Sequence, residues 1–429
     1  MKRILLVLVS LAIGIVMACS QTGVWSGNLE VGGTKLPLVF NLNPENPTVD
    51  SPAQSVKGIP VQVTHHSSDS IIISIPALGV HYRARYHQNE ITGIFSQRGA
   101  KLPLTLLPGE KRSVRPQTPI PPFPYSQEEV TFANGKAILK GTLTLPKDHN
   151  RDTPVLIMVT GSGLQNRDEE IYEHKPFAVI ADYLARNGIA TLRYDDRGFG
   201  ESTGDAANCT TEDLMHDALS GINLLRKRFN TVGVLGHSEG GSIAFMLGAD
   251  KKVDFIVSLA GAIISGKEIL LEQNRYMLSP AGYPQQVVNE YCQLLASAFD
   301  GNIETVNSQL KTAAIPEELK KNLKSGLNQL NSPYMKYSIA LDLRDRLSKV
   351  TCPVMALNGT KDTQVFYENN LDALKTGLPK NSKNQILALD NLNHLFQHCN
   401  TGSIIEYATI EETISPDVLE IIARWINSL

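Results

Sequence analysis

Continuous apolar runs that alternate with helical periodicity constrain the fold of this 429-residue chain more than any other feature. Residues 155–159 are apolar at every position, as expected of a strand that is covered on both faces of a sheet. Phe177, Ala181 and Leu184 then recur at helical spacing. The alternation predicts a mostly parallel sheet flanked by helices over residues 126–429. The further strands are predicted at 189–194, 232–235, 255–259, 353–357 and 385–389.

One segment of this region breaks the alternation. Residues 262–339 carry no strand signal, and their helical stretches are interrupted by prolines at 280, 284, 316 and 333. Because the segment stands between two predicted core strands, we expect an inserted helical cap.

The N-terminal quarter of the chain has a different pattern. Over residues 20–112, short alternating runs such as 36–42, 71–75 and 91–95 are separated by Gly, Pro, Asn and Asp, which predicts a small all-β barrel or sandwich. Residues 113–125 contain five prolines. Such a stretch favours extended geometry, so we expect a semi-rigid linker and a domain boundary there.

The first residues resemble an export signal. Lys2 and Arg3 precede an apolar run over residues 4–17, which is too short for a membrane-spanning helix of ~20 residues. Val16-Met17-Ala18-Cys19 resembles a bacterial lipobox, so residues 1–19 predict a protein exported to the periplasm or outer membrane and anchored through a lipidated Cys19. An ordinary signal peptide cut near Ala18 is the alternative.

Composition and motifs exclude several classes of function. The net charge is -3 and no long basic run is present, which argues against a nucleic-acid partner. No GxxxxGK[ST] or HExxH motif occurs, so neither a phosphate-binding loop of that type nor a zincin site is expected. Cysteines 209, 292, 352 and 399 lack CxxC spacing and are too few for a disulfide scaffold, although one or two bridges remain open.

The sequence Gly236-His237-Ser238-Glu239-Gly240 matches the GxSxG pattern of a nucleophile elbow. It follows the predicted strand 232–235 and precedes a helix, which is the placement that this motif requires. The glycines permit a turn that lifts the serine hydroxyl above the sheet. We therefore predict Ser238 as a nucleophile, and a serine nucleophile needs an adjacent base.

Loops after two later strands supply a carboxylate and an imidazole. Asp362 follows the strand 353–357 and His394 follows the strand 385–389, so both belong to the sheet edge at which Ser238 emerges. The expected roles are His394 as base and Asp362 as the acid that orients it. The rivals are Asp390 and Asp372 as acid and His398 as base, and His237 is expected to pack or to orient its neighbours.

Backbone amides should stabilise the oxyanion that forms during attack. One is expected from Glu239, directly after the nucleophile, and the other from Ser162 or Gly163, in the loop after the strand 155–159. These groups and the triad supply all the chemistry required, so no cofactor is expected.

Five motifs stand out in the second region, at residues 161–168, 194–202, 236–240, 357–365 and 393–397. Together they resemble the EstD-like esterase group of α/β hydrolases, which is close to the serine-aminopeptidase-type hydrolase domain. The resemblance covers residues 126–429 and implies hydrolysis of small, short-acyl carboxylic esters through an acyl-enzyme. Arg167 and Asp168 are expected to pair at the pocket mouth, and residues 195–197 to brace a loop.

Two other functions stay open at this point. A peptidase or a thioesterase could use the same triad, because the triad specifies acyl transfer and leaves the leaving group undefined. A surface-binding lipoprotein, in which the β module acts and the hydrolase domain is auxiliary, is a different class. The sequence predicts no oligomeric state.

Overall fold

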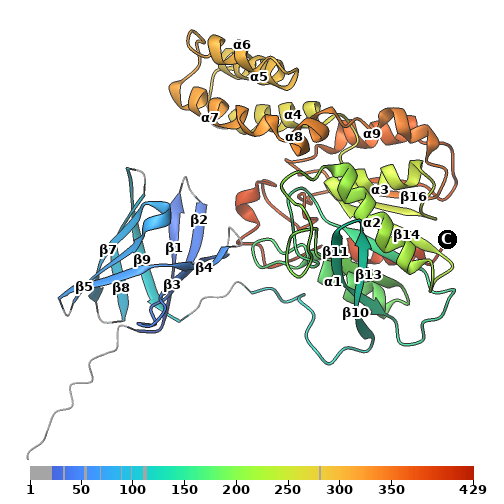
Figure 1. The fold of residues 1–429 in the computed structure, drawn as a ribbon, viewed down its shortest axis with the longest axis horizontal. Helices are drawn as coiled ribbons and strands as arrows, with labels where there is room; N and C mark the ends of the chain where they lie inside the picture. The colour runs from blue at the N-terminus through green and yellow to red at the C-terminus, as the bar shows by residue number, and fades with distance from the viewer. Residues whose placement is uncertain are drawn as a thin grey trace, which may run out of the picture. The chain divides into compact units, whose positions relative to one another are not determined.

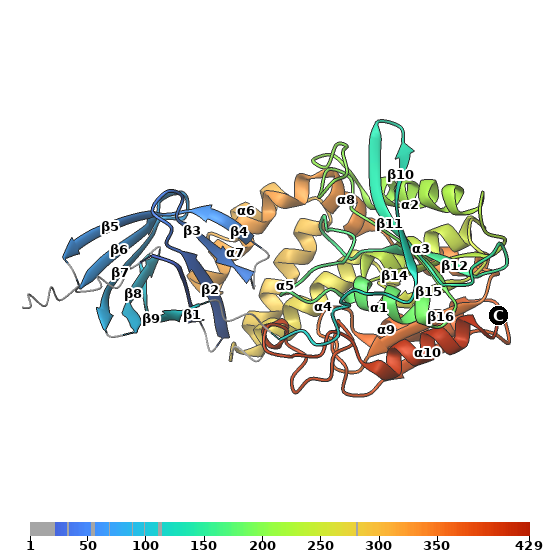
Figure 2. The ribbon, with the colours of Figure 1, turned by 90° about the horizontal axis from the view of Figure 1, so that it is seen from below.

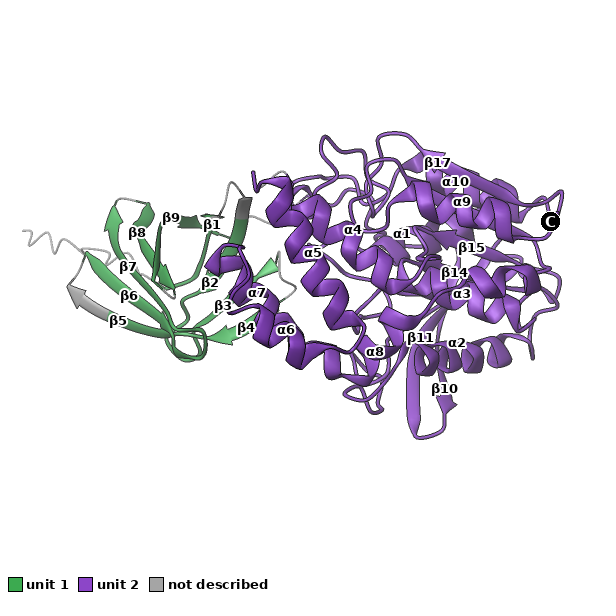
Figure 3. Ribbon diagram, turned by 90° about the horizontal axis from the view of Figure 1, so that it is seen from above, with its two compact units in different colours: residues 1–112 green, residues 113–429 purple. Residues whose placement is uncertain are grey.

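A computed structural model describes residues 22–31, 34–52, 56–67, 69–87, 89–97, 99–109, 114–279 and 282–429. The predicted export signal, with Cys19, and the proline at position 280 lie outside these ranges. The chain divides into two compact units, residues 1–112 and 113–429, which Figure 3 colours separately. Each unit is described by itself below.

The described part of the first unit is an antiparallel sheet, so the all-β prediction is confirmed. Its nine described strands are hydrogen bonded in the order β4-β3-β2-β1-β9-β8-β7-β6-β5. They are β1 (Val24–Val31), β2 (Thr34–Asn41), β3 (Thr48–Ser51), β4 (Val56–Pro60), β5 (Gln62–Ser67), β6 (Ser70–Ile75), β7 (Val80–His87), β8 (Glu90–Gln97) and β9 (Ala100–Pro108).

The two edge strands of this sheet are neighbours in sequence. Only Val61 separates β4 from β5, although they occupy opposite edges. The sheet therefore curls until its edges approach, which makes the unit barrel-like. Its inner face buries Trp25, Phe40, Ile73 and Tyr82. The Tyr82 hydroxyl donates to the backbone oxygens of two neighbouring strands, so this buried polar group is satisfied.

The second unit contains an eight-stranded sheet in the order β10-β11-β13-β12-β14-β15-β16-β17 (Figure 1). Strands β12 to β17 pair in parallel, as predicted, and β11 pairs antiparallel with β13. The strands are β10 (Ser126–Asn134), β11 (Ala137–Leu145), β12 (Val155–Val159), β13 (Ala190–Tyr194), β14 (Val232–His237), β15 (Ile256–Leu259), β16 (Val354–Gly359) and β17 (Gln385–Leu389). The β10–β11 hairpin, drawn as a long ribbon in Figure 2, is an addition to the predicted strands.

Helices cover both faces of this sheet. Because side chains alternate along a strand, Ile157 belongs to the core on one face of the sheet, which includes residues of α2 (Thr211–Leu225), α3 (Glu239–Ala249) and α9 (Tyr367–Gly377). Met158 faces the other way and belongs to the core that includes residues of α1 (Pro176–Arg186) and α10 (Pro416–Ile426). This two-sided burial explains why β12 is apolar throughout.

An α-helical insertion stands between β15 and β16, as predicted for residues 262–339. The prolines at 284 and 316 directly precede α5 and α7, and Pro333 opens α8, so these residues begin helices. The helices have a core of their own that includes Val288, Val306 and Leu323. They are α4 (Gly266–Leu278), α5 (Gln285–Phe299), α6 (Ile303–Gln309), α7 (Glu317–Leu327) and α8 (Pro333–Ala340).

The proline-rich segment at 114–125 is attached to the second unit and does not form a detached linker. The Arg115 guanidinium donates to the backbone oxygens of Tyr172, Ala408 and Ile410 at 2.8 to 3.1 Å. Gln117 accepts from the Thr413 amide at 2.6 Å and donates to the Ile414 oxygen at 2.7 Å. These contacts correct the expectation of a spacer.

In the described residues, no helix has both the length and the apolar character needed to cross a membrane.

Candidate active site

Ser238 lies in a strained turn between β14 and α3. Its backbone has φ 53° and ψ -117°, a conformation that non-glycine residues rarely adopt. The flanking glycines make room for it: a Cβ on Gly236 would lie 1.9 Å from the Gly240 oxygen, and one on Gly240 would lie 2.0 Å from the Val159 oxygen. The turn therefore requires the glycine spacing of the motif and presents Ser238 beyond the end of β14.

His394 and Asp362 meet in a hydrogen bond, with 2.8 Å between Nδ1 and Oδ2. Both side chains are buried, at 4% and 3% exposure. The Asp362 carboxylate also accepts from the amides of Gln364 and Val365, at 2.8 and 2.9 Å, and from the Asn358 side chain at 3.1 Å. These donors fix the carboxylate, and the carboxylate fixes the imidazole ring.

Ser238 and His394 line one cavity of about 390 Å³ in the second unit. Asp362 is absent from its lining and lies on the Nδ1 side of His394. Helices of the insertion supply an apolar wall, and Gln165, Gln273 and Gln364 add polar groups. The apolar wall includes Ile264, Ile269, Leu270, Met335 and Leu341.

The residues predicted for the oxyanion amides lie at the ends of two elements. Glu239 is the first residue of α3, where backbone N–H groups have no partner within the helix. Ser162 lines the cavity with Glu239, whereas Gly163 is not among the lining residues. The cavity lining therefore includes Ser162 and Glu239 among the residues predicted for the oxyanion amides.

The rival residues lie elsewhere. His398 pairs with Glu412 at 2.9 Å, and its side chain is 57% exposed. Asp372 is on α9 and faces Lys375 at 3.4 Å. Neither these two nor Asp390 lines the cavity.

Three buried carboxylates surround the turn that carries Ser238. Glu239 accepts from the hydroxyls of Thr211 and Tyr334, each at 2.6 Å. Burial and this carboxylate raise the pKa of Tyr334 above its ordinary range. Asp196 accepts from the Thr160 hydroxyl at 2.9 Å and from an amide at 2.8 Å, and burial raises its pKa to about 7.

The third carboxylate, Glu169, contacts His237. Its Oε1 lies 2.9 Å from His237 Nδ1 and accepts the Gly161 amide at 2.8 Å. His237 Nε2 lies 3.0 Å from the backbone oxygen of His394. Burial alone lowers the pKa of His237, but Glu169 outweighs that effect, and the pKa lies above its ordinary value.

Sequence reasoning missed the contributions of Glu169, Thr211 and Tyr334. Glu169 directly follows the motif residues Arg167 and Asp168, which was the available signal. No local pattern marks Tyr334, because it reaches Glu239 from α8, 95 positions away.

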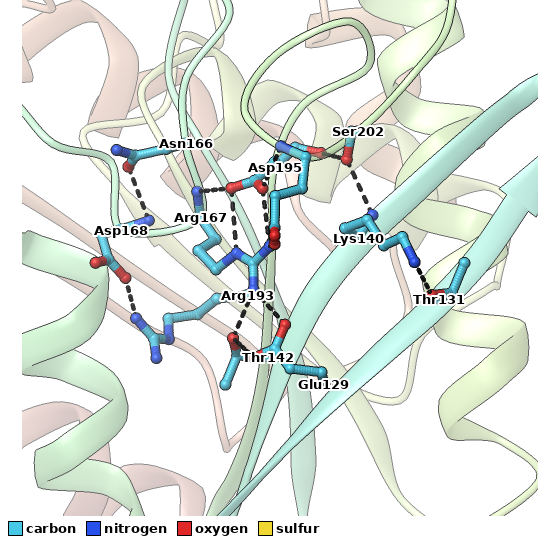
Figure 4. A network of polar contacts seen from close by, with 11 residues as sticks. Glu129, Thr131, Lys140, Thr142, Asn166, Arg167, Asp168, Arg193, Asp195 and Ser202 are labelled. Atoms are coloured by element: carbon cyan, nitrogen blue, oxygen red, sulfur yellow. Dashed lines mark hydrogen bonds and ion pairs between the residues drawn. The ribbon is translucent and has the colours of Figure 1, made fainter.

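Arg167 and Asp168 do not pair with each other, which corrects the expectation from the sequence. Arg167 binds Asp195, Glu129 and Glu201 at 2.6 to 2.9 Å, while Asp168 pairs with Arg193 (Figure 4). Neither Arg167 nor Asp168 lines the cavity that holds Ser238.

Residues 195–197 brace three neighbouring segments, as expected. Asp195 holds Arg167, Asp196 holds the loop after β12, and Arg197 binds Asp217 of α2 at 2.7 Å. Figure 4 shows part of this network, in which Asp195 holds Arg167 of the segment that follows β12.

The four cysteines at 209, 292, 352 and 399 are all free. Within the described ranges, no group of three or more His, Cys, Asp or Glu side chains is arranged to hold a metal ion.

Comparison with known proteins gives the relatives of this chain. Residues 173–396 match the family model described as serine aminopeptidase, S33. Esterase EstD of Thermotoga maritima is 30% identical over 313 residues, which cover 72% of this chain and 69% of that protein. An acyl transferase of Photobacterium leiognathi is 25% identical over 31% of this chain and 45% of that protein. The solved Pyrococcus furiosus esterase Pf2001 superposes with a TM-score of 0.44 and 15% identity, over 75% of this chain and 98% of the esterase.

Proposed function

This chain belongs to the serine aminopeptidase (S33) family of α/β hydrolases, and on that premise we propose that it cleaves carboxylic esters with Ser238, His394 and Asp362. The observation that carries the proposal is the His394–Asp362 hydrogen bond of 2.8 Å, beside a cavity that Ser238 and His394 line together. The 30% identity with an esterase supports esters as the substrates.

The proposed reaction has two halves. Ser238 Oγ attacks the carbonyl carbon while its proton passes to His394 Nε2, and Asp362 stabilises the imidazolium at Nδ1. The amides of Glu239 and Ser162 hold the oxyanion. When the C–O bond breaks, His394 gives its proton to the leaving alcohol, and an acyl group remains on Ser238. His394 then takes a proton from water, which attacks the acyl carbon. When the bond between that carbon and Ser238 Oγ breaks, His394 returns the proton to Oγ, and the acid leaves.

Hydrolysis of p-nitrophenyl butyrate by the wild-type protein and by Ser238→Ala tests this proposal. We expect the substitution to lower kcat by about 10⁴-fold or more, because no other group supplies the nucleophile. The matched control is His398→Gln, which removes the rival imidazole and should leave the rate within twofold. Equal turnover by wild type and Ser238→Ala, or none by the wild type with any ester of a chain-length series, would refute the esterase proposal.

The family description raises peptidase activity as a second candidate. An aminopeptidase needs a carboxylate for the free α-ammonium of its substrate. The two carboxylates that line the cavity, Glu169 and Glu239, are each already hydrogen bonded to two donors. We therefore expect p-nitrophenyl esters to exceed aminoacyl p-nitroanilides in kcat/KM, and a panel that includes acyl-CoA thioesters measures the order directly. A higher value for the anilides would reverse this assignment.

Export and lipid attachment form a separate proposal that depends on residues 1–19 alone. We propose that Cys19 is the lipidated first residue of the mature protein, which would anchor the protein in the periplasm or at the outer membrane. Labelled palmitate should enter the wild-type protein and not Cys19→Ala. Equal labelling of the two proteins, or no labelling of either, would leave only the ordinary signal peptide.

A further inference from the structure

We propose that Glu169 and His237 form a buried clamp that positions the oxyanion loop and the base loop around Ser238, and that loss of the clamp's proton sets the alkaline limit of activity. The inference rests on the proposed esterase function and adds two positioning residues to it. Neither residue is assigned contact with the substrate's reacting atoms.

The clamp joins three segments that are distant in sequence. Glu169 Oε1 accepts the Gly161 amide at 2.8 Å, which fixes the loop that carries Ser162. The same oxygen lies 2.9 Å from Nδ1 of His237, the residue before Ser238. Nε2 of His237 lies 3.0 Å from the backbone oxygen of His394, which fixes the base loop. One carboxylate and one imidazole thus hold the nucleophile, the base and an oxyanion amide in one arrangement.

The contacts of His237 dictate its protonation. A carbonyl oxygen only accepts hydrogen bonds, so the contact with His394 needs a hydrogen on Nε2. A carboxylate also accepts, so the contact with Glu169 needs a proton between Nδ1 and Oε1. A neutral imidazole beside an ionised carboxylate supplies only one of these two protons. All the hydrogen bonds of the clamp therefore form only when the His237–Glu169 pair carries two protons, one on Nε2 and one between Nδ1 and Oε1.

The surroundings favour that state. Glu169 and His237 are 3% and 6% exposed, and they border a small void with the apolar side chains of Phe177, Ile180 and Leu259. Burial opposes a charged imidazole, but the adjacent carboxylate outweighs it, so the pKa of His237 lies above its ordinary value.

The other ionisable groups around the Glu169–His237 pair belong to the proposed triad and the nucleophile turn, together with Asp196, which interacts electrostatically with Glu169. The His394 ring centroid is 4.7 Å away, the Asp362 carboxylate also favours a charged His237, and Glu239 lines the same cavity. Because the pKa of His237 is raised, the clamp is intact at lower pH and is lost as the pH rises through that pKa.

Glu169 is also held in an unfavourable backbone conformation. Its φ is 53°, in the left-handed region that costs a non-glycine residue on the order of 1 kcal/mol. The two hydrogen bonds at Oε1 and the burial of the side chain offset this strain. Strain of this kind at a residue that ties three loops together supports a positioning role.

The decisive variant is Glu169→Gln, assayed with p-nitrophenyl butyrate from about pH 5 to pH 10. Without the carboxylate, burial dominates and His237 loses its proton at lower pH. We expect the alkaline limb of kcat to move down by about one pH unit or more, so that kcat falls about tenfold at pH 8 and much less at pH 6. KM should change less than twofold, because glutamine has nearly the size of glutamate and every other residue of the cavity lining is unchanged. A uniform loss of kcat across the pH range would mean a merely structural role and would overturn the proposal.

The chain contains a matched control. Glu412 and His398 form a pair with the same 2.9 Å separation, also in the second unit, but the His398 side chain is 57% exposed. Glu412→Gln removes an equivalent carboxylate without touching the clamp, so its pH profile should match that of the wild type. An equal alkaline shift in both variants would assign the effect to general electrostatics and reject the clamp.

Two further measurements keep the test decisive if Glu169→Gln does not fold. His237→Gln has no titrating ring, so its kcat should be lower and the alkaline limb absent; a limb at the wild-type position rejects the proposal. In a pH titration, the ring ¹⁵N shifts of the wild-type histidines should include one imidazole that keeps both nitrogens protonated to a higher pH than an ordinary histidine does, and no such ring would also reject the proposal. The ¹⁵N measurement needs no turnover, so it separates failure of the clamp from failure of the esterase proposal.

Discussion

At the scale of single residues, Glu239 combines two properties at one position. Its backbone amide belongs to the first turn of α3, where we propose that it stabilises the oxyanion. Its carboxylate is buried and accepts from Thr211 and Tyr334. An acidic side chain is favourable at a helix N-terminus, and two hydroxyl donors replace the water it has lost. The side chain thus anchors the amide that the proposed chemistry requires.

Removal of one donor should therefore affect both stability and rate. Tyr334→Phe leaves the buried Glu239 carboxylate with Thr211 alone, and we expect a loss of about 1.5 to 3 kcal/mol in unfolding free energy and a lower kcat. Chemical denaturation and p-nitrophenyl butyrate assays measure the two effects. Tyr337→Phe, on the same helix, is the control, because the Tyr337 hydroxyl makes no hydrogen bond within the described residues. Equal effects of the two substitutions would contradict the assigned contact.

Asp196 gives a prediction for pH. Burial raises its pKa from 3.8 to about 7, so the folded protein retains a proton that the unfolded chain releases. The stability contribution of this carboxyl is full below about pH 4 and falls as the pH rises to about 7, by about 1.4 kcal/mol per pH unit. Asp196→Asn cannot ionise, so its unfolding free energy should decline less over this range. Denaturant titrations at four or five pH values compare the slopes, and parallel slopes would show that Asp196 is already ionised in the fold.

At the scale of elements, the strands that are buried in the structure were the ones that the sequence predicted best. Strand β12 was predicted with its observed bounds because both of its faces are covered, which leaves an unbroken apolar run. A capping box of Thr210 and Asp213 begins α2, and four consecutive residues specify this local interaction. The hairpin β10–β11 was missed because β10 is mostly exposed and carries little apolar signal. Its Asn134-Gly135 pair, with Gly135 at φ 57°, was the sign available.

The candidate site divides in the same way. Ser238, Asp362 and His394 each follow a readable strand, so the parallel topology brings their loops to one edge. This part of the site could be predicted because the parallel direction of the strands is enough to place the three loops, without knowledge of individual side-chain contacts. Glu169 and Tyr334 depend on a left-handed backbone and on a contact between distant elements, neither of which a local pattern reports. The predicted ion pair between Arg167 and Asp168 was wrong for the same reason, because each residue binds a partner from another segment of the chain.

The helical insertion yields a prediction about substrate size. Leu323 is 2% exposed in the core that the insertion helices share, so Leu323→Ala should cost about 2 to 5 kcal/mol locally. A loosened insertion should raise KM for long-acyl esters, which need the apolar wall, and leave kcat for p-nitrophenyl acetate nearly unchanged. Hydrogen exchange of residues 262–339 and an acyl-length series measure both effects. Loss of acetate turnover would instead show that the insertion supports the proposed triad itself.

At the scale of the whole molecule, every residue assigned to the site belongs to one compact unit. Residues 113–429 contain the sheet, the insertion and the attached segment that Arg115 fastens. The first unit has a separate core around Trp25 and Tyr82. We therefore expect the proposed ester hydrolysis to proceed without the barrel-like unit.

Deletion of that unit tests this separation. A protein that begins at residue 114 should fold and retain kcat and KM for p-nitrophenyl butyrate within about twofold, because it keeps every residue assigned to the site and the whole core of the second unit. Circular dichroism and steady-state kinetics measure the result, and Ser238→Ala in the same truncated chain supplies the background. A well-folded but inactive truncation would show that the first unit contributes to the site.

The placement of the insertion has a consequence for evolution and engineering. The two ends of the insertion are hydrogen bonded to each other, because the Gly266 amide donates to the Leu341 oxygen and the Leu343 amide donates to the Ile263 oxygen, each at 3.1 Å. A segment whose two ends meet can be lengthened, shortened or exchanged without a change in the strand order beneath it. Exchange of the insertion can therefore change which substrates fit the cavity, while the strands and loops that carry the proposed triad stay the same.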